Sequence, residues 1–309
     1  MKKVLVSNMT SIKAIDYLEN SGYKVIVNSQ SSDDDFLSNS DVDGILIMMH
    51  PFGENLMSKM TNLKIVARHG VGYDNVDLDA ANAHDIVVTN TPGANATAVA
   101  ETAMMHIFMA GRLFYQRHEA ITGNADNIFL AKHQGQELTG KTVGIIGYGH
   151  IGKEIDRMLS GFNVSVLAYA RHQHEVANGH MATLAEIYEQ ADFIVTALPA
   201  TVETKHMIDA SVFKKMKKTA VLINIGRGAL VDEKALIDAL NNEEIAGAGL
   251  DVVEEEPIKA DNPLLRLPNV FVTPHVAMIS QEAMDNVALT AAEDIVRVLT
   301  GKQAMFPVK

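Results

Sequence analysis

The chain has 309 residues, of which 47% are hydrophobic and 21% charged, and its formal net charge is −12. This length predicts about two domains with separate cores, and the composition is that of a globular protein, not a disordered one. The negative charge argues against nucleic acid or an anionic membrane surface as a partner. The absence of cysteine excludes disulfides, thiol nucleophiles and thiolate metal sites.

Two segments bear on location. The apolar run within residues 1–6 is too short for a signal peptide. The longest apolar helix candidate, residues 96–110, carries Glu101 and His106 and is unsuited to cross a membrane. We therefore expect a soluble, cytoplasmic protein.

Short strands alternate with helices through the first hundred residues. Residues 12–20 form an amphipathic helix, and the acidic stretch 29–43 is expected to be a solvated loop or the start of a helix. A long apolar helix at about residues 98–117 then leaves this unit. Strands are expected at residues 3–7, 23–27, 44–49, 63–68 and 86–89. This alternation indicates an open α/β sheet.

The second half shows the same alternation after a polar stretch at residues 123–140. Strands are expected at residues 142–146, 164–169, 193–198, 221–225, 246–251 and 269–273, and helices at 183–189, 233–240 and 281–300. Roughly six strands is the number of a full doubly wound sheet. The fold class is therefore α/β, with two Rossmann-like or flavodoxin-like domains built on parallel sheets.

The glycine-rich turn after residues 142–146 has the pattern G-x-G-x-x-G, with glycine at 147, 149 and 152, and a helix is expected to begin at Lys153. Gly147 permits a tight turn, Gly149 lets the backbone approach a pyrophosphate, and Gly152 lets the helix pack on the strand. The free N–H groups of the helix would face the phosphate charge. Glycine-rich turns are common, but this position between strand and helix favours dinucleotide binding over a structural turn.

Arg227, Glu256 and His275 follow successive strands, at the strand ends where ligands of such sheets gather. Each residue alone would usually be solvated surface, but together they suit the reduction of a 2-keto acid. The histidine would supply the proton, the carboxylate would orient its ring, and the arginine would bind the substrate carboxylate.

The chain resembles the D-isomer-specific 2-hydroxyacid dehydrogenases, a family that includes glyoxylate/hydroxypyruvate reductases and D-3-phosphoglycerate dehydrogenases. The similarity covers nearly the whole chain. The motifs that carry it lie at residues 70–75, 91–93, 99–101, 147–152, 198–199 with Thr204, 224–228, 249–257 and 273–277.

The resemblance implies that Arg227 binds the substrate carboxylate and keto oxygen and that His275 is the acid/base. It implies Glu256 as the partner of His275, because Glu256 immediately precedes Pro257, whereas its neighbours Glu254 and Glu255 do not. A glutamate here also differs from the glutamine of the formate dehydrogenase branch.

Further contacts follow from the same resemblance. The backbone of Val71 and Gly72 would hold the substrate carboxylate, although glycines at 70 and 72 also suit a plain tight turn. Asp251 would hydrogen-bond the nicotinamide amide. The other expected cofactor contacts are Thr97, Gly147, Gly149, His150, Ile151, Gly152, Ala170, Arg171, His172, Leu198, Pro199, Thr204, Asn224, Ile225 and Gly226.

The resemblance also implies a discontinuous substrate domain, residues 1–97 and 282–309, around a dinucleotide-binding domain at residues 98–281. It makes a homodimer the expected assembly, with the apolar helix 98–117 in the interface. Packing within one chain would explain the apolar character of that helix equally well.

The choice of cofactor depends on the end of the strand at residues 164–169. An NAD site needs an acidic residue there for the ribose 2′-OH, but Ala170, Arg171 and His172 follow. An arginine suits a 2′-phosphate, so NADP is the preferred cofactor and NAD stays possible. His172, His174 and His180 match no standard metal spacing, and no metal is expected.

The sequence thus predicts an NADP-preferring reductase of small 2-keto acids such as glyoxylate or hydroxypyruvate. One alternative is the D-3-phosphoglycerate dehydrogenase of serine biosynthesis, which needs cations for a phosphate. Another is a non-catalytic, dinucleotide-sensing corepressor, against which the presence of Arg227, Glu256 and His275 together argues. Met278 and Ile279, where relatives carry small residues, would reshape the pocket near His275.

Overall fold

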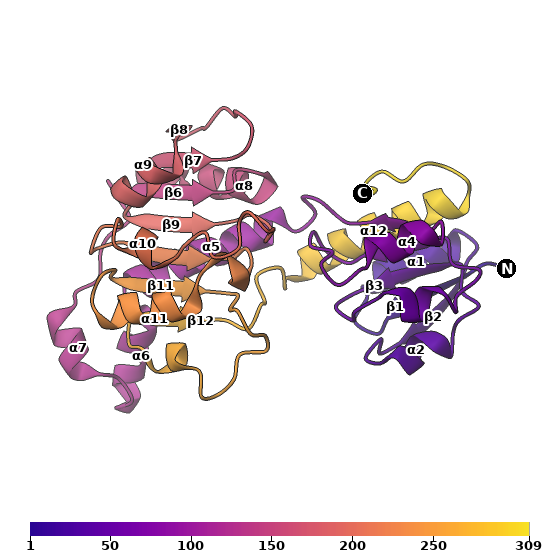
Figure 1. Cartoon of the computed structure of the whole chain (residues 1–309), viewed down its shortest axis with the longest axis horizontal. Coiled ribbons are helices and arrows are strands. Elements are labelled where there is room, and N and C mark those ends of the chain that lie inside the picture. Colours follow the sequence, from indigo (N-terminus) through magenta and orange to yellow (C-terminus); the bar gives the residue numbers. More distant parts are fainter. Residues whose placement is uncertain (309) are drawn as a thin grey trace. The chain divides into compact units, whose positions relative to one another are not determined.

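The computed structural model describes residues 1–308 and divides into two compact units (Figure 1). One unit contains Met1–Asn95 and the described residues from Met278 onward, and the other is Ala96–Ala277. The first unit is thus made of two separate segments of the chain, whereas the roles of the two units as substrate domain and dinucleotide-binding domain stay predictions. The domain boundaries expected at 97 and 281 compare with 95 and 277 in the structure.

The first unit is built on a parallel five-stranded sheet with the order β2-β1-β3-β4-β5. Its strands are β1 (Lys3–Ser7), β2 (Lys24–Asn28), β3 (Gly44–Ile47), β4 (Ile65–Arg68) and β5 (Val87–Thr89). Its helices are α1 (Ile12–Asn20), α2 (Asp33–Leu37), α3 (Glu54–Met57), α4 (Leu78–Ala83) and α12 (Gln281–Leu299). The acidic stretch therefore contains a short helix, capped by Ser32, whose side chain accepts from the backbone N–H of Asp35.

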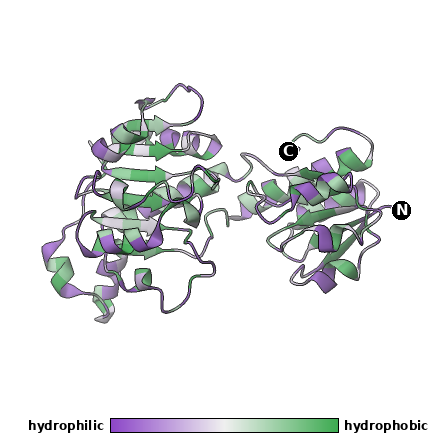
Figure 2. Ribbon diagram, viewed as in Figure 1, coloured by the Kyte–Doolittle hydropathy of each residue, from purple (hydrophilic) through white to green (hydrophobic). Residues whose placement is uncertain are grey.

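Both faces of this sheet are covered by a core. Successive strand residues point to opposite sides, so neighbouring residues belong to different cores. Leu5 packs with Phe36 on one face, whereas Val4 packs with Ile295 of α12 on the other. This two-sided burial explains why the strands read as continuous apolar runs. Figure 2 shows hydrophobic residues along the strands and hydrophilic residues along loops and outer helix surfaces.

The end of the chain returns to the first unit, as the resemblance implied. The backbone N–H of Val308 donates to Val88 at 2.9 Å, and Pro307 bridges Thr89. The buried carboxylate of Asp294 in α12 accepts from the backbone N–H groups of Met305 and Phe306, at 2.6 and 3.1 Å. A tail with little sequence pattern is thus held by backbone hydrogen bonds.

The second unit is a parallel seven-stranded sheet with the order β12-β11-β10-β9-β6-β7-β8. Its strands are β6 (Thr142–Ile146), β7 (Ser165–Tyr169), β8 (Gly179–Met181), β9 (Phe193–Thr196), β10 (Val221–Asn224), β11 (Gly247–Leu250) and β12 (Val270–Val272). Its α-helices are α5 (Ala96–Gly111), α6 (Phe114–Thr122), α7 (Asn127–Lys132), α8 (His150–Leu159), α9 (Leu184–Gln190), α10 (Ala210–Phe213) and α11 (Glu233–Asn241).

The edge strand β8 is one more than the six expected. A Cβ on its Gly179 would lie 1.8 Å from the carbonyl oxygen of Val166 in β7. A glycine with polar neighbours gives no hydrophobic periodicity, so this strand is invisible in the sequence.

The expectation of one helix over residues 98–117 is wrong. Helix α5 ends at Gly111, Leu113 has a left-handed φ of 54°, and α6 begins at Phe114. Gly111 packs on Phe193, where a Cβ would lie 2.6 Å from the ring. Apolar residues continue across the break, so their spacing does not show it. The polar stretch after residue 122 also contains α7, which Asp126 caps.

None of the described helices combines the length and the apolar character needed to cross a membrane.

Candidate active site

In the turn after β6, each of the three glycines lies in a different steric environment. Gly147 has a φ of 107°, and a Cβ on it would lie 2.6 Å from the carbonyl oxygen of Ala197. A Cβ on Gly152 would lie 2.3 Å from the carbonyl oxygen of Gly147. Gly149 faces open space and is the N-cap of α8, which has no side-chain cap. Uncapped N–H groups beside open space fit a pyrophosphate.

Helix α8 therefore begins at His150, three residues before the expected Lys153. His150 and Ile151 lie in the first turn of α8. Backbone N–H groups in the first turn of a helix can donate to a phosphate, and this is the kind of contact expected of the two residues.

A buried carboxylate beneath this turn holds the neighbouring loop in place. Asp156 of α8 accepts a short hydrogen bond from the Tyr148 hydroxyl, one of 2.8 Å from the Ala177 backbone and one of 2.7 Å from the Asn178 side chain. Burial, and then the bond to Asp156, raises the pKa of Tyr148. Asp156 thus ties the loop between β7 and β8 to the glycine turn, and sequence reasoning missed it.

The other expected cofactor residues of this unit follow the carboxyl ends of its strands. Ala170, Arg171 and His172 come directly after β7, and Arg171 and His172 are exposed. Leu198 and Pro199 follow β9, and Thr204 donates its hydroxyl to the Pro199 carbonyl at 3.0 Å. Ligands of parallel sheets bind at this edge.

Asn224 ends β10 and shapes the turn through Ile225 and Gly226. Its Oδ1 accepts from the Gly226 backbone at 3.1 Å, and its Nδ2 donates to the Arg227 carbonyl at 3.0 Å. Thr97 lies elsewhere, on α5, where its hydroxyl meets Glu154 of α8 at 3.4 Å.

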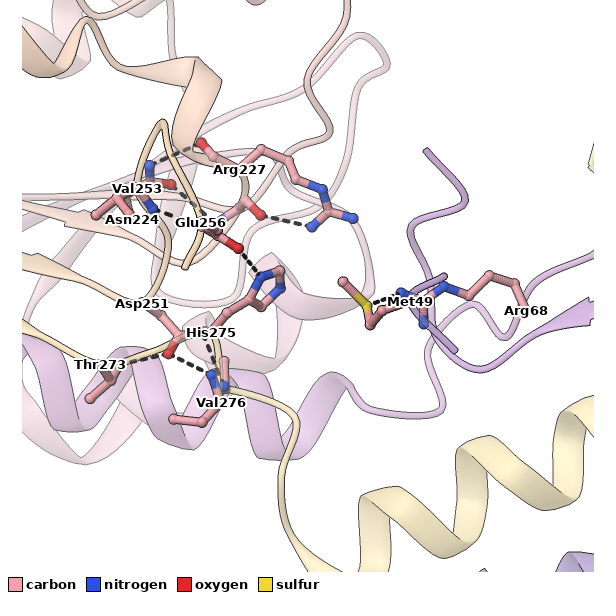
Figure 3. Close-up of polar contacts among 12 residues, drawn as sticks. Met49, Arg68, Asn224, Arg227, Asp251, Val253, Glu256, Thr273, His275 and Val276 are labelled. Atoms are coloured by element: carbon pink, nitrogen blue, oxygen red, sulfur yellow. Dashed lines mark hydrogen bonds and ion pairs between the residues drawn. The ribbon is translucent and has the colours of Figure 1, made fainter. Parts of the chain in front are cut away.

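The structure brings His275 and Glu256 together (Figure 3). His275 Nδ1 lies 2.7 Å from Glu256 Oε2, and Glu256 Oε1 accepts from the Val253 backbone at 3.2 Å. The adjacent carboxylates have other partners: Glu254 pairs with His206, and Glu255 pairs with Lys259 at 2.5 Å. The geometry therefore separates three consecutive glutamates that composition alone does not distinguish.

The electrostatic setting of Glu256 favours its ionised form. Burial works against ionisation, but the hydrogen bond and charge of His275, the Val253 N–H and the charge of Arg227 outweigh it. The pKa of Glu256 is consequently held below its ordinary value.

Arg227 follows β10 in the turn beside this pair. Its Nη1 donates to the Gly226 carbonyl at 2.8 Å. A Cβ on Gly228 would lie 1.9 Å from the Val253 carbonyl oxygen, so the arginine turn packs directly against the segment that leads to Glu256. This contact between backbones explains why glycine follows the arginine.

Asp251 is buried below His275 and accepts from the chain on either side of it. Its carboxylate takes hydrogen bonds from the Thr273 hydroxyl at 2.6 Å and from the Val276 and Ala277 N–H groups at 3.0 and 2.9 Å. A nicotinamide contact for Asp251 stays a prediction.

Val71 and Gly72 belong to the first unit, in the loop after β4. The Val71 carbonyl accepts from the Asn90 side chain at 2.7 Å. Arg68, which the sequence did not single out, lies over Gly70, where a Cβ would be 2.4 Å from its Nη1, and its Nη2 contacts Met49 Sδ at 3.1 Å (Figure 3). The substrate contact of Val71 and Gly72 stays a prediction.

Across residues 1–308, no cluster of three or more histidine, aspartate or glutamate side chains is arranged to hold a metal ion.

Comparison with known proteins decides the family. Residues 104–277 match the model of the D-isomer specific 2-hydroxyacid dehydrogenase NAD binding domain. The chain belongs to this family. It is accordingly an NAD(P)-dependent oxidoreductase, as the sequence predicted.

Two curated relatives show how far the likeness extends. A D-3-phosphoglycerate dehydrogenase of Archaeoglobus fulgidus is 36% identical over 97% of this chain, which spans only 58% of that longer protein. A glyoxylate/hydroxypyruvate reductase B of Escherichia fergusonii is 37% identical over 85% of this chain and 83% of its own length.

The fold of this dehydrogenase is also that of solved relatives. An NADPH-dependent glyoxylate/hydroxypyruvate reductase from Sinorhizobium meliloti, in complex with NADP and malonate, matches with a TM-score of 0.84 and 32% identity. The match covers 99% of this chain and 96% of that one. The family resemblance and the α/β fold inferred from the sequence are both confirmed.

Proposed function

We propose that this dehydrogenase is an NADPH-preferring reductase of small 2-keto acids such as glyoxylate and hydroxypyruvate, with D-2-hydroxy acids as products. The observation that carries the proposal is the 2.7 Å contact between His275 and Glu256, beside Arg227. All three residues follow strands of the sheet whose glycine turn fits a dinucleotide. A protein that only sensed a dinucleotide would need none of the three, which argues against the corepressor.

The bound nicotinamide cofactor supplies a hydride for the carbonyl carbon, and the chain supplies the rest. Arg227 binds the substrate carboxylate and polarises the keto oxygen, because its planar guanidinium matches two oxygens. His275 donates the proton to the keto oxygen from Nε2, since Nδ1 is engaged by Glu256. Glu256 fixes the orientation of the ring through its contact with Nδ1.

The preference for NADPH rests on the end of β7. No carboxylate follows Tyr169, and Arg171 and His172 are exposed there. A cation at this position suits a 2′-phosphate and offers no acceptor for a free 2′-hydroxyl. The relatives named glyoxylate/hydroxypyruvate reductase, including the NADPH-dependent one, agree with both parts of the proposal.

Phosphoglycerate dehydrogenase is the second candidate, and one observation favours it. Arg68 places a guanidinium directly over Gly70, in the loop expected to hold the substrate carboxylate. A cation there suits a phosphorylated substrate. The archaeal relative with that name also matches nearly the whole chain.

A substrate panel tests both candidates. Glyoxylate, hydroxypyruvate and 3-phosphohydroxypyruvate are each assayed with NADPH and NADH. We expect the unphosphorylated acids and NADPH to give the highest kcat/KM. A higher kcat/KM with the phosphorylated acid would support the second candidate instead.

The His275→Ala variant tests the mechanism. We expect kcat to fall about 100- to 10,000-fold, because the group that supplies the proton is lost. His84→Ala, which removes a histidine paired with Glu54 at 3.0 Å in the first unit, serves as the control and is expected to keep kcat. Activity that survives His275→Ala would refute the proposed mechanism.

We also propose a homodimer, and the support lies on the helices of the second unit. Met105 of α5, Phe114 and Ile121 of α6, and Ile128 of α7 are large apolar side chains that the single chain leaves exposed. Sedimentation velocity of the wild type measures the assembly, and a purely monomeric species would contradict it. A cytoplasmic location stays a prediction.

A further inference from the structure

A buried histidine far in sequence from the residues of the proposed active site is linked to them through hydrogen bonds. His106 lies in α5, is fully buried, and has its Nε2 2.9 Å from the Thr273 hydroxyl oxygen. Thr273 follows β12 and precedes His275 by two residues. The catalytic proposal assigns no task to His106, although a buried polar ring needs a reason.

The direction of each hydrogen bond follows from the chemistry of the groups. The Thr273 hydroxyl has one proton, and it donates that proton to the Asp251 carboxylate at 2.6 Å, because a carboxylate only accepts. The contact with His106 Nε2 must therefore run the other way, from a ring N–H to the Thr273 oxygen. His106 is the neutral Nε2–H tautomer, and its Nδ1 is buried with no hydrogen-bond partner.

Packing fixes the ring in this orientation. A Cβ on Gly249 of β11 would lie 3.0 Å from His106 Nδ1, so a glycine makes room for the ring. The Phe271 ring of β12 lies 5.2 Å from the His106 ring, centre to centre. Burial lowers the pKa of His106 to about 4, which keeps the ring neutral at ordinary pH.

Asp251 passes this constraint to the backbone around His275. Its carboxylate accepts from Val276 and Ala277, and its carbonyl accepts from the His275 N–H at 2.8 Å. His275 has a φ of 54°, a left-handed conformation that side-chain-bearing residues adopt only when their surroundings enforce it. The hydrogen bonds to Asp251 are such an enforcement, and they set where the His275 ring points.

We propose that His106 is a positioning residue for His275, acting through Thr273 and Asp251. It donates to Thr273, which commits the Thr273 proton to Asp251 and holds the carboxylate in place for the backbone N–H groups after His275. The catalytic part of this inference rests on the proposed role of His275, whereas the structural part does not.

Variants of His106 and Thr273, the first two residues in the chain of hydrogen bonds from His106 through Thr273 to Asp251, test the proposal. This chain is called the relay below. The set is His106→Leu, which removes the ring N–H, His106→Gln, which keeps an N–H donor at similar reach, Thr273→Val, which removes the hydroxyl, the double variant His106→Leu/Thr273→Val, and the control Ile107→Val, a buried apolar change on the same helix.

Steady-state kinetics with NADPH and glyoxylate give the first measurement. We expect His106→Leu and Thr273→Val each to lower kcat about 10-fold, with KM within about twofold, because the proton donor is displaced while the substrate contacts remain. His106→Gln should recover most of kcat. The double variant should be no slower than Thr273→Val alone, since that change already breaks the relay.

Amide hydrogen exchange gives a second measurement that needs no activity. We expect the Val276 and Ala277 amides to exchange about 10-fold faster in His106→Leu, while the Asp251 amide, bonded to the Asn224 carbonyl at 2.9 Å, keeps its protection. Ile107→Val should leave these rates and kcat unchanged.

The outcomes separate the two proposals. A wild type that reduces no 2-keto acid refutes the proposed function, and the exchange rates then still decide whether His106 holds the loop. Wild-type exchange and kcat in His106→Leu would overturn the positioning role. Additive losses in the double variant, or an equal loss in Ile107→Val, would overturn it as well, because the effect would not pass through Thr273.

Discussion

The charge state of the proposed catalytic pair, His275 and Glu256, depends on a few individual groups around Glu256. Glu256 is accessible to solvent, and the depression of its pKa depends on His275, on the Val253 N–H and on Arg227, which together outweigh the effect of partial burial. A carboxylate with a depressed pKa contributes stability above its unfolded pKa and loses that contribution as pH falls through the folded pKa. Because its side chain is 33% exposed, screening keeps this stability term small, and activity is the more sensitive measurement.

Replacing one of the adjacent carboxylates at a time tests the assignment of Glu256. Glu256→Gln removes the anion that holds His275 Nδ1, so we expect kcat at pH 7 to fall about 10- to 1000-fold. Glu254→Gln, whose carboxylate pairs with His206 instead, is the matched control and should stay within about twofold of the wild type. Equal losses in both variants would show that the contact with His275 is not what matters.

The pH dependence follows from the sign of the shift. Because the pKa of Glu256 lies below its ordinary value of 4.5, the wild type should keep the pair intact as pH falls toward that value. The kcat of the wild type and of Glu256→Gln is measured between pH 4 and pH 7. The difference between the two gives the part of kcat that depends on ionised Glu256. A wild type that lost the Glu256-dependent part of kcat well above the ordinary glutamate pKa would contradict the sign.

At the scale of elements, the loop between β7 and β8 is held from beneath by α8. Asp156 is fully buried and accepts from Tyr148, Ala177 and Asn178. Removing a buried acceptor leaves its donors unpaired, which costs more than the hydrogen bonds themselves contribute. The loop that carries Arg171 and His172 therefore owes its position to a carboxylate on another element.

The Asp156→Ala variant measures that anchoring. We expect the free energy of unfolding of the second unit to fall by about 3 kcal/mol, because the buried Tyr148 hydroxyl and the part-buried donors of Ala177 and Asn178 lose their acceptor. Glu189→Ala, an exposed change at the end of α9, should shift it by no more than about 0.5 kcal/mol. Urea titration followed by circular dichroism compares the two, and equal midpoints would contradict the anchoring role.

The same loop carries the prediction for cofactor choice. Arg171→Asp should raise the KM for NADPH about 10-fold or more, because a charge-assisted hydrogen bond to the 2′-phosphate is replaced by repulsion. The KM for NADH should change little. Arg266→Asp, an exposed charge reversal in the same unit, is the control. An equal rise in the KM values for NADPH and NADH would refute the assignment of Arg171 to the 2′-phosphate.

At the scale of the whole molecule, the two units differ in how the chain builds them. The second unit is one continuous segment, Ala96–Ala277, whereas the first needs α12 from the end of the chain. Helix α12 places Ala288, Ala291, Ala292 and Ile295, all at most 1% exposed, in the core beside β1 and β3. Without α12, one face of that sheet would be open to water.

Fragments test this difference. Residues 96–277 should fold alone and show a cooperative thermal transition by circular dichroism, because their core is complete. Residues 1–95 alone should show none, because an apolar sheet face without its covering helix loses its main stabilising burial. A chain of residues 1–95 linked to 278–309 by a flexible Gly/Ser segment should regain it. Cooperative unfolding of 1–95 alone would contradict the argument.

What the sequence determined by itself is local. The two parallel sheets can be inferred from buried strands that read as apolar runs. The glycine turn can be inferred from the glycines themselves, because Gly147 has a left-handed φ and Gly152 has no room for a side chain. The positions of Arg227, Glu256 and His275 after successive strands put them at one sheet edge, because all these strands run parallel.

Tertiary structure decided whatever depends on partners distant in sequence. The break at Leu113 follows a close contact of Gly111 with Phe193, and β8 depends on Gly179 meeting Val166. His106 meets Thr273 across 167 residues, and no periodicity marks such a pair. Hydrogen bonds and steric contacts are satisfied in space and not along the chain, so residues that read as ordinary packing in the sequence become the supports of the proposed active site.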